Sequence, residues 1–247
     1  MAVWGTDLMT FIGSNVKIEK DASVGNNSII LGRTVIESGV VIEDNCMIGK
    51  PSDEQILQLK GRMRQSLSLE DYDDIVDTKT VIKRNCYIQR HSTIYSGTIL
   101  EEDIVCKDYT SIGWDTVVGK NSKMLFRAQV HSWVAVGEAC RIGGFCCNDS
   151  RLGDRVSNFG NLLHAYREYG GGRREPAPKI GDDVIIGFGA QVIGAVTVGD
   201  NSYVAAGSVV TKNVPPNTIV MLVNKHCHIS KWHGELKRIR DLHVRLE

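Results

Sequence analysis

The sequence predicts an all-β fold, a parallel β-helix, with one helical insertion and a C-terminal α-helix. The main observation is a strict six-residue period between Lys179 and Val214, where an aliphatic residue recurs at Ile180, Ile186, Val192, Val198, Val204 and Val210. An amphipathic helix repeats its apolar residues every three or four positions and a simple strand every second position, so neither produces this spacing. A parallel β-helix does, because each hexad supplies one short strand and one turn, and three hexads close a triangular coil.

Small residues at fixed places in each hexad support this interpretation. The residue after the aliphatic position is small at Gly181, Gly187, Gly199 and Ala205. Four positions after the aliphatic residue, where a corner of the prism is crowded, stand Val184, Ala190, Val196, Ser202, Ser208 and Val214. Only 6% of the 247 residues are aromatic while 25 are Gly, which suits a thin prism filled by Ile and Val.

The first part of the chain divides into a cap, a run of coils and an insertion. Residues 1–10 carry no repeat and are expected to cap the open end of the prism, and hexads run through residues 11–50. In the insertion, residues 51–79, Ser52 and Gln55 resemble a capping box ahead of apolar residues at helical spacing. Two interpretations stay open: a lid or subunit contact on the prism wall, and a part of the acceptor site.

The second part of the chain holds the remaining coils and a second interruption. Hexads resume over residues 80–163, but the frame jumps between Ile142 and Leu152, and Asn158 takes an aliphatic position. Because the polar residues 148–150 are not expected inside, one corner is expected to bulge there. Residues 164–178 form a Gly-rich loop with two Pro, residues 179–220 form the last coils, and residues 221–247 are expected to form a helix. The total is about 26 hexads, or eight to nine coils.

Composition limits the class of protein. The chain has 29 basic and 29 acidic residues, so no nucleic-acid surface is indicated. No apolar run approaches the ~20 residues of a membrane span and the first residues lack a signal-peptide pattern, so a soluble cytoplasmic protein is expected. The cysteines at positions four residues after an aliphatic residue are expected to be reduced core thiols, namely Cys46, Cys86, Cys140 and Cys146.

The segment from Lys179, and above all AGSVVTKNVPPNTIV at 206–220, resembles the C-terminal coils of the hexapeptide-repeat acyltransferases. The resemblance implies a left-handed prism, a homotrimer, and acetyl-CoA or another acyl-CoA as co-substrate, with no metal ion. Two features depart from the family pattern: Ile185 stands where family members often have Trp, and the exit from Met221 lacks the family's G-x-P-A-K. The second departure leaves Lys225 and Lys231 as positional guesses for nucleotide contacts.

Two histidines are candidates for a general base, since a neutral imidazole accepts a proton near pH 7. His164 lies at the start of the Gly-rich loop and before the coil that begins IGDDV, which resembles the arrangement in maltose, galactoside and xenobiotic acetyltransferases. In that family the equivalent His deprotonates the acceptor hydroxyl, which attacks the thioester directly. His131 is the alternative, and its surroundings weakly resemble a stretch of the lipid A acyltransferases.

The resemblance also implies where CoA binds. The family places the pantetheine arm in a groove between subunits, beside small residues of the last coils, and the matching residues here are Ala205, Ala206, Gly207, Ser208 and Lys212. Lys212 suits a phosphate, although an ordinary solvated Lys is the alternative. Gly187 and Gly189 would allow a ligand to approach closely, but both also fit plain turn requirements.

The resemblance thus implies a CoA-dependent O- or N-acetyltransferase that acts on a sugar, a sugar nucleotide or an aminoglycoside-like amine. A non-catalytic β-helix that scaffolds a complex is the first alternative. A γ-type carbonic anhydrase is the second, because His91, His131 and His164 are present, although the H-x4-H spacing of its metal site is not.

Overall fold

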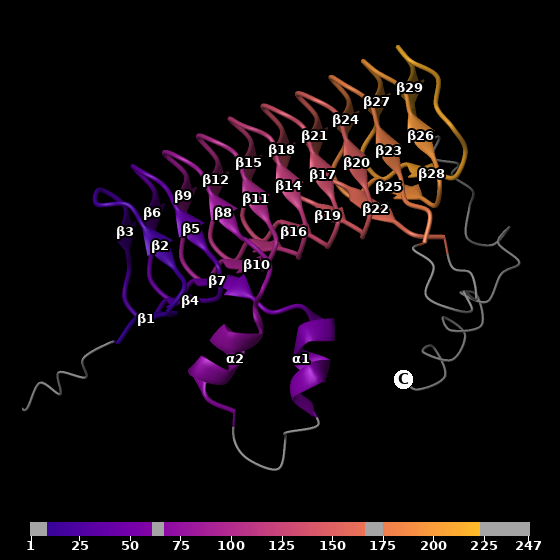
Figure 1. The fold of residues 1–247 in the computed structure, drawn as a ribbon. Coiled ribbons are helices and arrows are strands. Elements are labelled where there is room, and N and C mark those ends of the chain that lie inside the picture. The colour runs from indigo at the N-terminus through magenta and orange to yellow at the C-terminus, as the bar shows by residue number, and fades with distance from the viewer. Residues whose placement is uncertain (1–8, 61–66, 166–174, 223–247) are drawn as a thin grey trace, which may run out of the picture.

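The computed structural model describes residues 9–60, 67–165 and 175–222, which wind into a triangular prism of short parallel strands (Figure 1). The expected C-terminal helix with Trp232, most of the expected cap and the centre of the Gly-rich loop lie outside these residues. In the described part of the chain, neither helix has the length and apolar content that crossing a bilayer requires.

Three parallel sheets form the sides of the prism. Sheet A contains β1 (Phe11–Ile12), β4 (Ile29–Ile30), β7 (Met47–Lys50), β10 (Thr93–Tyr95), β13 (Ser111–Ile112), β16 (Gln129–Val130), β19 (Phe145–Cys146), β22 (Asn161–Leu163), β25 (Gln191–Ile193) and β28 (Val209–Val210). Sheet B contains β2 (Lys17–Ile18), β5 (Val35–Ile36), β8 (Val81–Ile82), β11 (Ile99–Leu100), β14 (Val117–Val118), β17 (Ala135–Val136), β20 (Arg151–Leu152), β23 (Lys179–Ile180) and β26 (Thr197–Val198). Sheet C contains β3 (Ser23–Val24), β6 (Val41–Ile42), β9 (Tyr87–Ile88), β12 (Val105–Cys106), β15 (Lys123–Met124), β18 (Arg141–Ile142), β21 (Ser157–Asn158), β24 (Ile185–Ile186), β27 (Tyr203–Val204) and β29 (Ile219–Val220). The chain runs from A to B to C and back to A, and we call the connections the A–B, B–C and C–A corners.

The architecture is that of the left-handed parallel β-helix, as the six-residue period and the family resemblance predicted. In most strands the second residue points into the prism, and Ile30, Ile82 and Ile186 are completely buried. The predicted polar member of this set, Asn158, is also completely buried, and its side-chain oxygen accepts a hydrogen bond from Gly160 N at 3.1 Å. The core is therefore a stack of aliphatic layers, each removed from water by the coils above and below.

The corner residues four positions after the aliphatic site are buried as expected, and many bond to the next coil. The hydroxyl of Thr98 donates to the carbonyl of Gly113 at 2.8 Å, and the thiol of Cys86 donates to the carbonyl of Glu101 at 3.0 Å, in both cases 15 residues along the chain. The six described cysteines are all free and buried, which bears out the expectation of core thiols. Burial raises the pKa of Cys86 to about 12, so this thiol stays protonated and acts as a small hydrogen-bond donor.

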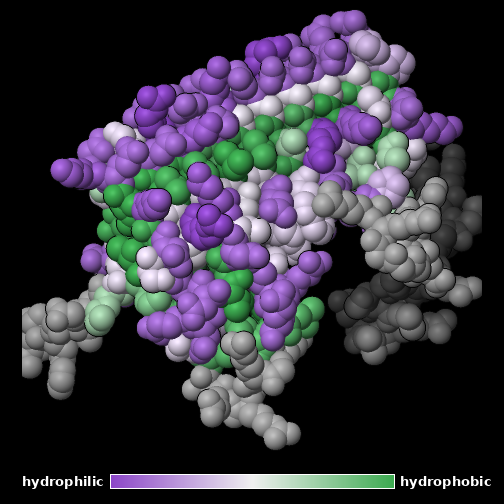
Figure 2. All heavy atoms as spheres, in the orientation of Figure 1, coloured by the Kyte–Doolittle hydropathy of each residue, from purple (hydrophilic) through white to green (hydrophobic). Residues whose placement is uncertain are grey.

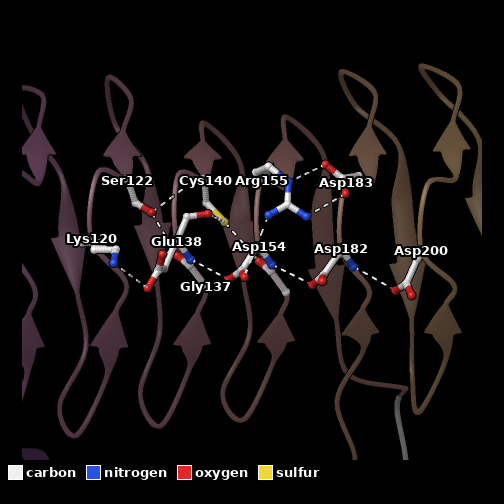
Figure 3. A network of polar contacts seen from close by, with 11 residues as sticks. Lys120, Ser122, Gly137, Glu138, Cys140, Asp154, Arg155, Asp182, Asp183 and Asp200 are labelled. Carbon is white, nitrogen blue, oxygen red and sulfur yellow. Dashed lines mark hydrogen bonds and ion pairs between the residues drawn. The ribbon is translucent and has the colours of Figure 1, made fainter.

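The B–C corner carries a ladder of carboxylates that ties successive coils together (Figure 3). Asp154 accepts a hydrogen bond from Glu138 N, Asp182 accepts one from Asp154 N, and Asp200 accepts one from Asp182 N, each at 2.9 Å. These bonds satisfy corner N–H groups that no strand partner reaches. Figure 2 shows the result as a continuous hydrophilic rim along the edge of the prism that lies farthest from the helices.

The number of coils is larger than the sequence predicted. Two of the sheets contain ten strands, so the prism has about ten coils and not eight to nine. The expected bulge between Ile142 and Leu152 is wrong, because the chain is shorter there: only Gly143 and Gly144 join β18 to β19. This C–A corner puts Cys146 at the inward strand position instead of a corner position, and Ser150 is completely buried.

A second short corner follows one coil later. Only Phe159 and Gly160 join β21 to β22 at the same C–A edge, whereas the C–A corners other than these two contain four residues. Gly144 permits the close approach of the two short corners, since a Cβ at Gly144 would overlap the backbone of Gly160. The count of hexads missed both strands that follow these corners.

The insertion forms two helices, α1 (Asp53–Lys60) and α2 (Leu69–Ile75), which project from the A–B edge (Figure 1). The expected capping box is present: Gln55 N donates to the Ser52 hydroxyl at 3.2 Å, and Ser52 N donates to the Gln55 side chain at 2.9 Å. Ser96, in a coil of the prism, donates to the same Gln55 oxygen at 3.1 Å. The start of α1 is thereby fixed to the prism wall.

Candidate functional site

Both candidate histidines lie at the A–B corner. His131 follows β16 directly and His164 follows β22, and these strands are separated in sheet A only by β19. The corner returns to the same edge in every coil, so the solenoid brings together two residues that are 33 positions apart. The third histidine of the carbonic anhydrase alternative, His91, lies at the C–A corner and stacks on Tyr109 with ring centroids 4.9 Å apart.

His131 is held by its backbone and by one aromatic neighbour. Its N–H donates to the carbonyl of Cys146 at 2.9 Å, its carbonyl accepts from the Thr116 hydroxyl at 2.9 Å, and its ring lies 4.7 Å from that of Phe145. Partial desolvation, and to a smaller extent the charge of His164, lower the pKa of His131 below its ordinary value of 6.5. The imidazole therefore remains neutral, and able to accept a proton, to lower pH than a free histidine.

His164 is oriented by acceptors on the far side of the Gly-rich loop. Its Nδ1 lies 3.5 Å from a carboxylate oxygen of Glu175 and 3.4 Å from the carbonyl of Pro176. Both neighbours accept hydrogen bonds, so they favour the tautomer that carries the proton on Nδ1. Nε2 then has its lone pair available, as a general base requires.

Two clefts adjoin one another between α1 and the A–B corner. The smaller, of about 270 Å³, is lined by Asp53, Tyr95, Ser111, Gly113, Trp114, Val130, His131, Ser132 and Asn148. The larger, of about 520 Å³, is lined by Ser52, Glu54, Gln55, Gln58, Asp77, Thr78, Ser96, Trp114, Asp115 and Trp133. Trp114 lines both clefts, and the smaller one brings Asp53 of α1 and His131 to the same cavity. Part of the insertion therefore faces a candidate catalytic residue.

A third cleft, of about 510 Å³, lies on the other side of the histidines. Its lining includes Glu175, Asp149, Arg151 and Lys179. Arg151 forms a hydrogen bond with the carbonyl of Trp133 and lies 3.9 Å from the carboxylate of Asp149. This cleft has both signs of charge and contains the partner of His164.

The small residues assigned to CoA lie at a different corner from the histidines. Gly187, Gly189, Ala205, Ala206, Gly207 and Ser208 belong to C–A corners of the last coils, and Lys212 is exposed at the A–B corner after β28. A Cβ at Gly187 would lie 2.5 Å from Ala206 N, so coil stacking alone requires this glycine. A Cβ at Gly189 would meet nothing within 4 Å, and Ser208 is buried. Within one chain, sheet A separates these residues from the histidines.

The aromatic residues of the A–B corner were not found from the sequence. Trp114 and Trp133 meet edge to face with ring centroids 5.5 Å apart, and Tyr95 lies 5.9 Å from Trp114. Tyr95 and Trp114 are 19 residues apart, as are Trp114 and Trp133. This spacing is close to the length of one coil, and side chains one coil apart stack at the same corner. The spacing could therefore have predicted that these rings are neighbours. Within the described residues, no group of three or more His, Cys, Asp or Glu side chains is placed to hold a metal ion.

Comparison with known proteins agrees with the architecture. Residues 177–212 match the family described as bacterial transferase hexapeptide (six repeats), and residues 15–49 and 39–52 match the hexapeptide repeat of succinyl-transferase. The chain therefore contains hexapeptide repeats like those of bacterial transferases, in its first and in its last coils.

Individual relatives are more distant. The chain is 27% identical over 223 residues to the bifunctional protein GlmU of Clostridium novyi, covering 90% of this chain and 41% of GlmU. It is 29% identical over 168 residues to GlmU of Trichormus variabilis, covering 60% of this chain and 37% of GlmU. The solved structure of LpxA from Acinetobacter baumannii is 12% identical with a TM-score of 0.44, covering 94% of this chain and 75% of LpxA. The chain thus spans about two-fifths of the length of the GlmU proteins it matches.

Proposed function

We propose that the chain is a CoA-dependent acyltransferase that transfers an acetyl group from acetyl-CoA to a hydroxyl or amine of a sugar, a sugar nucleotide or an aminoglycoside-like acceptor. The observation that carries this proposal is the A–B corner, where His164, with Nδ1 facing Glu175, lies near His131, and His131 lines an open cleft. The similarity to GlmU proteins and the hexapeptide repeats support the same class of reaction.

In the proposed reaction His164 Nε2 takes the proton from the acceptor as its oxygen or nitrogen attacks the thioester carbonyl. The new C–O or C–N bond forms, and a backbone N–H stabilises the negative charge on the carbonyl oxygen. The C–S bond then breaks and the thiolate of CoA takes the proton from the imidazolium. Glu175 stabilises the imidazolium that exists between these steps. His131 is the alternative base.

The acyl donor is proposed to lie at the C–A corner of a neighbouring subunit. A Cβ at Gly189 would meet nothing within 4 Å there, and Ala206 and Gly207 are exposed. Because the histidines of the same chain lie at another corner, a complete site requires two chains, which supports a homotrimer. Lys212, at the A–B corner, is retained as a candidate for a phosphate of CoA.

Single substitutions of the histidines test the reaction. His164→Ala is expected to lower turnover by about 10²–10⁴ with little change in CoA binding, because loss of a general base affects the proton transfer and not the groove. His131→Ala identifies the alternative base if it alone loses turnover. His91→Ala is the matched control, since it removes an imidazole from the C–A corner and is expected to leave turnover near normal.

Thermal stabilisation by CoA tests the class of protein independently. A ligand that binds only the native state raises the melting temperature. No rise at saturating CoA, together with no measurable turnover by the parent protein, would contradict the proposal and favour a scaffold.

A further inference from the structure

The two adjoining clefts between α1 and the A–B corner have a lining that discriminates among the possible acceptors. Their walls are rigid, since the Gln55 side chain bonds to Ser96 of the prism at 3.1 Å and to Asp77 at 3.1 Å. Gln55 thereby links the start of α1, the segment after α2 and a coil of the prism. A cleft with fixed walls selects its ligand by shape and charge without having to be ordered first.

Aromatic rings form the floor of this region. Trp114 faces both clefts, and Trp133 meets it edge to face with an angle of 85° between the rings. Trp133 occupies a corner position with φ of 59°, the left-handed region in which most other coils have Asn or Asp. A bulky side chain in this conformation costs conformational energy and does not stabilise the turn. The presence of Trp133 at this position is therefore better explained by the contacts of its ring. The polarised C–H groups on the face of a sugar ring pack well on such indole surfaces.

Charged groups in the lining are all acidic. Asp53 faces the smaller cleft, and Glu54, Asp77 and Asp115 face the larger, whereas the described lining of both contains no Lys or Arg. Beside the smaller cleft, Lys50 donates to the hydroxyl of Tyr95 at 2.9 Å and lies over the Tyr95 ring.

The N-terminus of α1 does not make the clefts attractive to an anion. Its first turn contains Asp53 and Glu54, which offset the positive end of the helix dipole. A phosphate in the larger cleft would meet Glu54, Asp77 and Asp115 with no Lys or Arg in the described lining, whereas an ammonium would be attracted.

We propose that the acceptor is an amino sugar with a free ammonium group and without phosphate. Its ring lies against Trp114, its ammonium faces Glu54 and Asp77, and its reactive group points along the cleft toward His131. Among the acceptor classes considered above, this favours the aminoglycoside-like amine over the sugar nucleotide. The inference rests on the proposed function, because it assumes that the ligand of these clefts is the acyl acceptor. The binding preference itself is measurable without acyl-CoA.

Three matched probes test the preference: D-glucosamine, D-glucose and D-glucose 6-phosphate, titrated calorimetrically into the full-length protein at pH 6.5 and low salt. The expected order of affinity is glucosamine, then glucose, then glucose 6-phosphate. Added salt is expected to weaken glucosamine binding and to leave glucose binding unchanged, because it screens only the charged interaction.

Variants locate the binding. Glu54→Gln and Asp77→Asn are each expected to weaken glucosamine roughly two- to fivefold and to leave glucose unchanged, as expected for partly exposed charge pairs. Trp114→Ala is expected to weaken glucosamine and glucose alike by about tenfold, and Trp114→Phe less, provided that both variants melt as the parent does. Glu19→Gln removes an exposed carboxylate that lines neither cleft, in the first coil of the prism, and is the control for net charge.

Several outcomes would overturn the proposal. These are tighter binding of glucose 6-phosphate than of glucosamine, an equal effect of Glu19→Gln and Glu54→Gln, and no binding of any probe at millimolar concentration. Failure of the proposed function is distinguishable, because glucosamine would then bind as described while CoA gave no thermal shift. Preferred acylation of phosphorylated sugars, with the CoA shift intact, would refute only the assignment of the cleft.

Discussion

The carboxylate of Asp73 accepts a 2.6 Å hydrogen bond from the backbone nitrogen of Gly32, a residue 41 positions earlier in the chain. It also accepts bonds from the N–H of Ser14 at 2.9 Å and from the Ser14 hydroxyl at 3.3 Å. Asp73 is almost fully buried, and the absence of a side chain at Gly13 gives it room. A single carboxylate from α2 thus holds the insertion against two successive coils of the prism.

Replacing Asp73 with Ala is expected to destabilise the protein by about 1–3 kcal/mol, because the buried N–H groups of Gly32 and Ser14 lose their acceptor. Urea unfolding measures the change. Asp74→Ala is the matched control, since Asp74 is the exposed neighbour in the same helix. Equal effects of the two substitutions would contradict the role of Asp73 as an anchor.

Ala139 occupies a corner position with φ of 54°, where the two preceding coils have Asp103 and Asn121. Asn tolerates this left-handed conformation better than Ala does, and Asn85 already bonds to Asp103 of the next coil at 3.2 Å in this row. Ala139→Asn is therefore expected to stabilise the protein by about 0.5–1 kcal/mol. The measurement is the melting temperature, and Ala195→Asn, at an exposed position without positive φ, is expected to give no such gain.

The environment of His131 predicts a dependence of stability on pH. Its folded-state pKa is lowered from 6.5, so between the two values the unfolded chain binds more protons and stability rises with pH. As the pH falls below 6.5, the parent protein is expected to lose stability faster than His131→Gln. At pH 8, where the imidazole is neutral in both states, the difference between the two proteins should no longer vary with pH. Parallel stability curves from pH 5 to pH 8 would show that His131 is not desolvated.

The separation of the histidines from the small C–A residues predicts complementation between two inactive chains. His164→Ala removes the proposed base, and Ala206→Trp fills the proposed groove for the acyl donor. If each site combines the A–B corner of one chain with the C–A corner of its neighbour, random mixing leaves about a quarter of the sites intact. The mixture, refolded together, should regain activity that neither variant has alone. Activity no greater than the sum of the two variants would place both groups in one chain.

Most of the fold could be predicted because the inward positions are chemically uniform. The period identified Ile82 and Ile186 as core residues, and even the polar Asn158 was placed correctly from its neighbours. The short corners could not be predicted, since Cys146 is small enough for a corner and apolar enough for the inward position of a strand. Only the pairing of β16 with β19 in the structure shows that Cys146 takes the inward strand position and not the corner position.

The candidate site was predictable in part. The two histidines follow from the family resemblance, and the return of the chain to one corner explains why they are near each other. The clefts beside them depend on how α1 docks, and the anchors Gln55 and Asp73 act through single hydrogen bonds that have no periodic signature. Trp114 and Trp133 line a site only because α1 covers them.

Changes of length are distributed unequally among the three edges of the prism. The helical insertion and the Gly-rich loop both lengthen the A–B edge, the two shortened turns both trim the C–A edge, and each B–C connection between named strands contains four residues. The carboxylate ladder accounts for this constancy in the last four B–C connections, since each carboxylate must lie level with the backbone N–H of the preceding coil. The B–C edge therefore keeps the coils in constant register. Segments can be added at the A–B edge or removed at the C–A edge without changing the spacing of the side chains on the other coils.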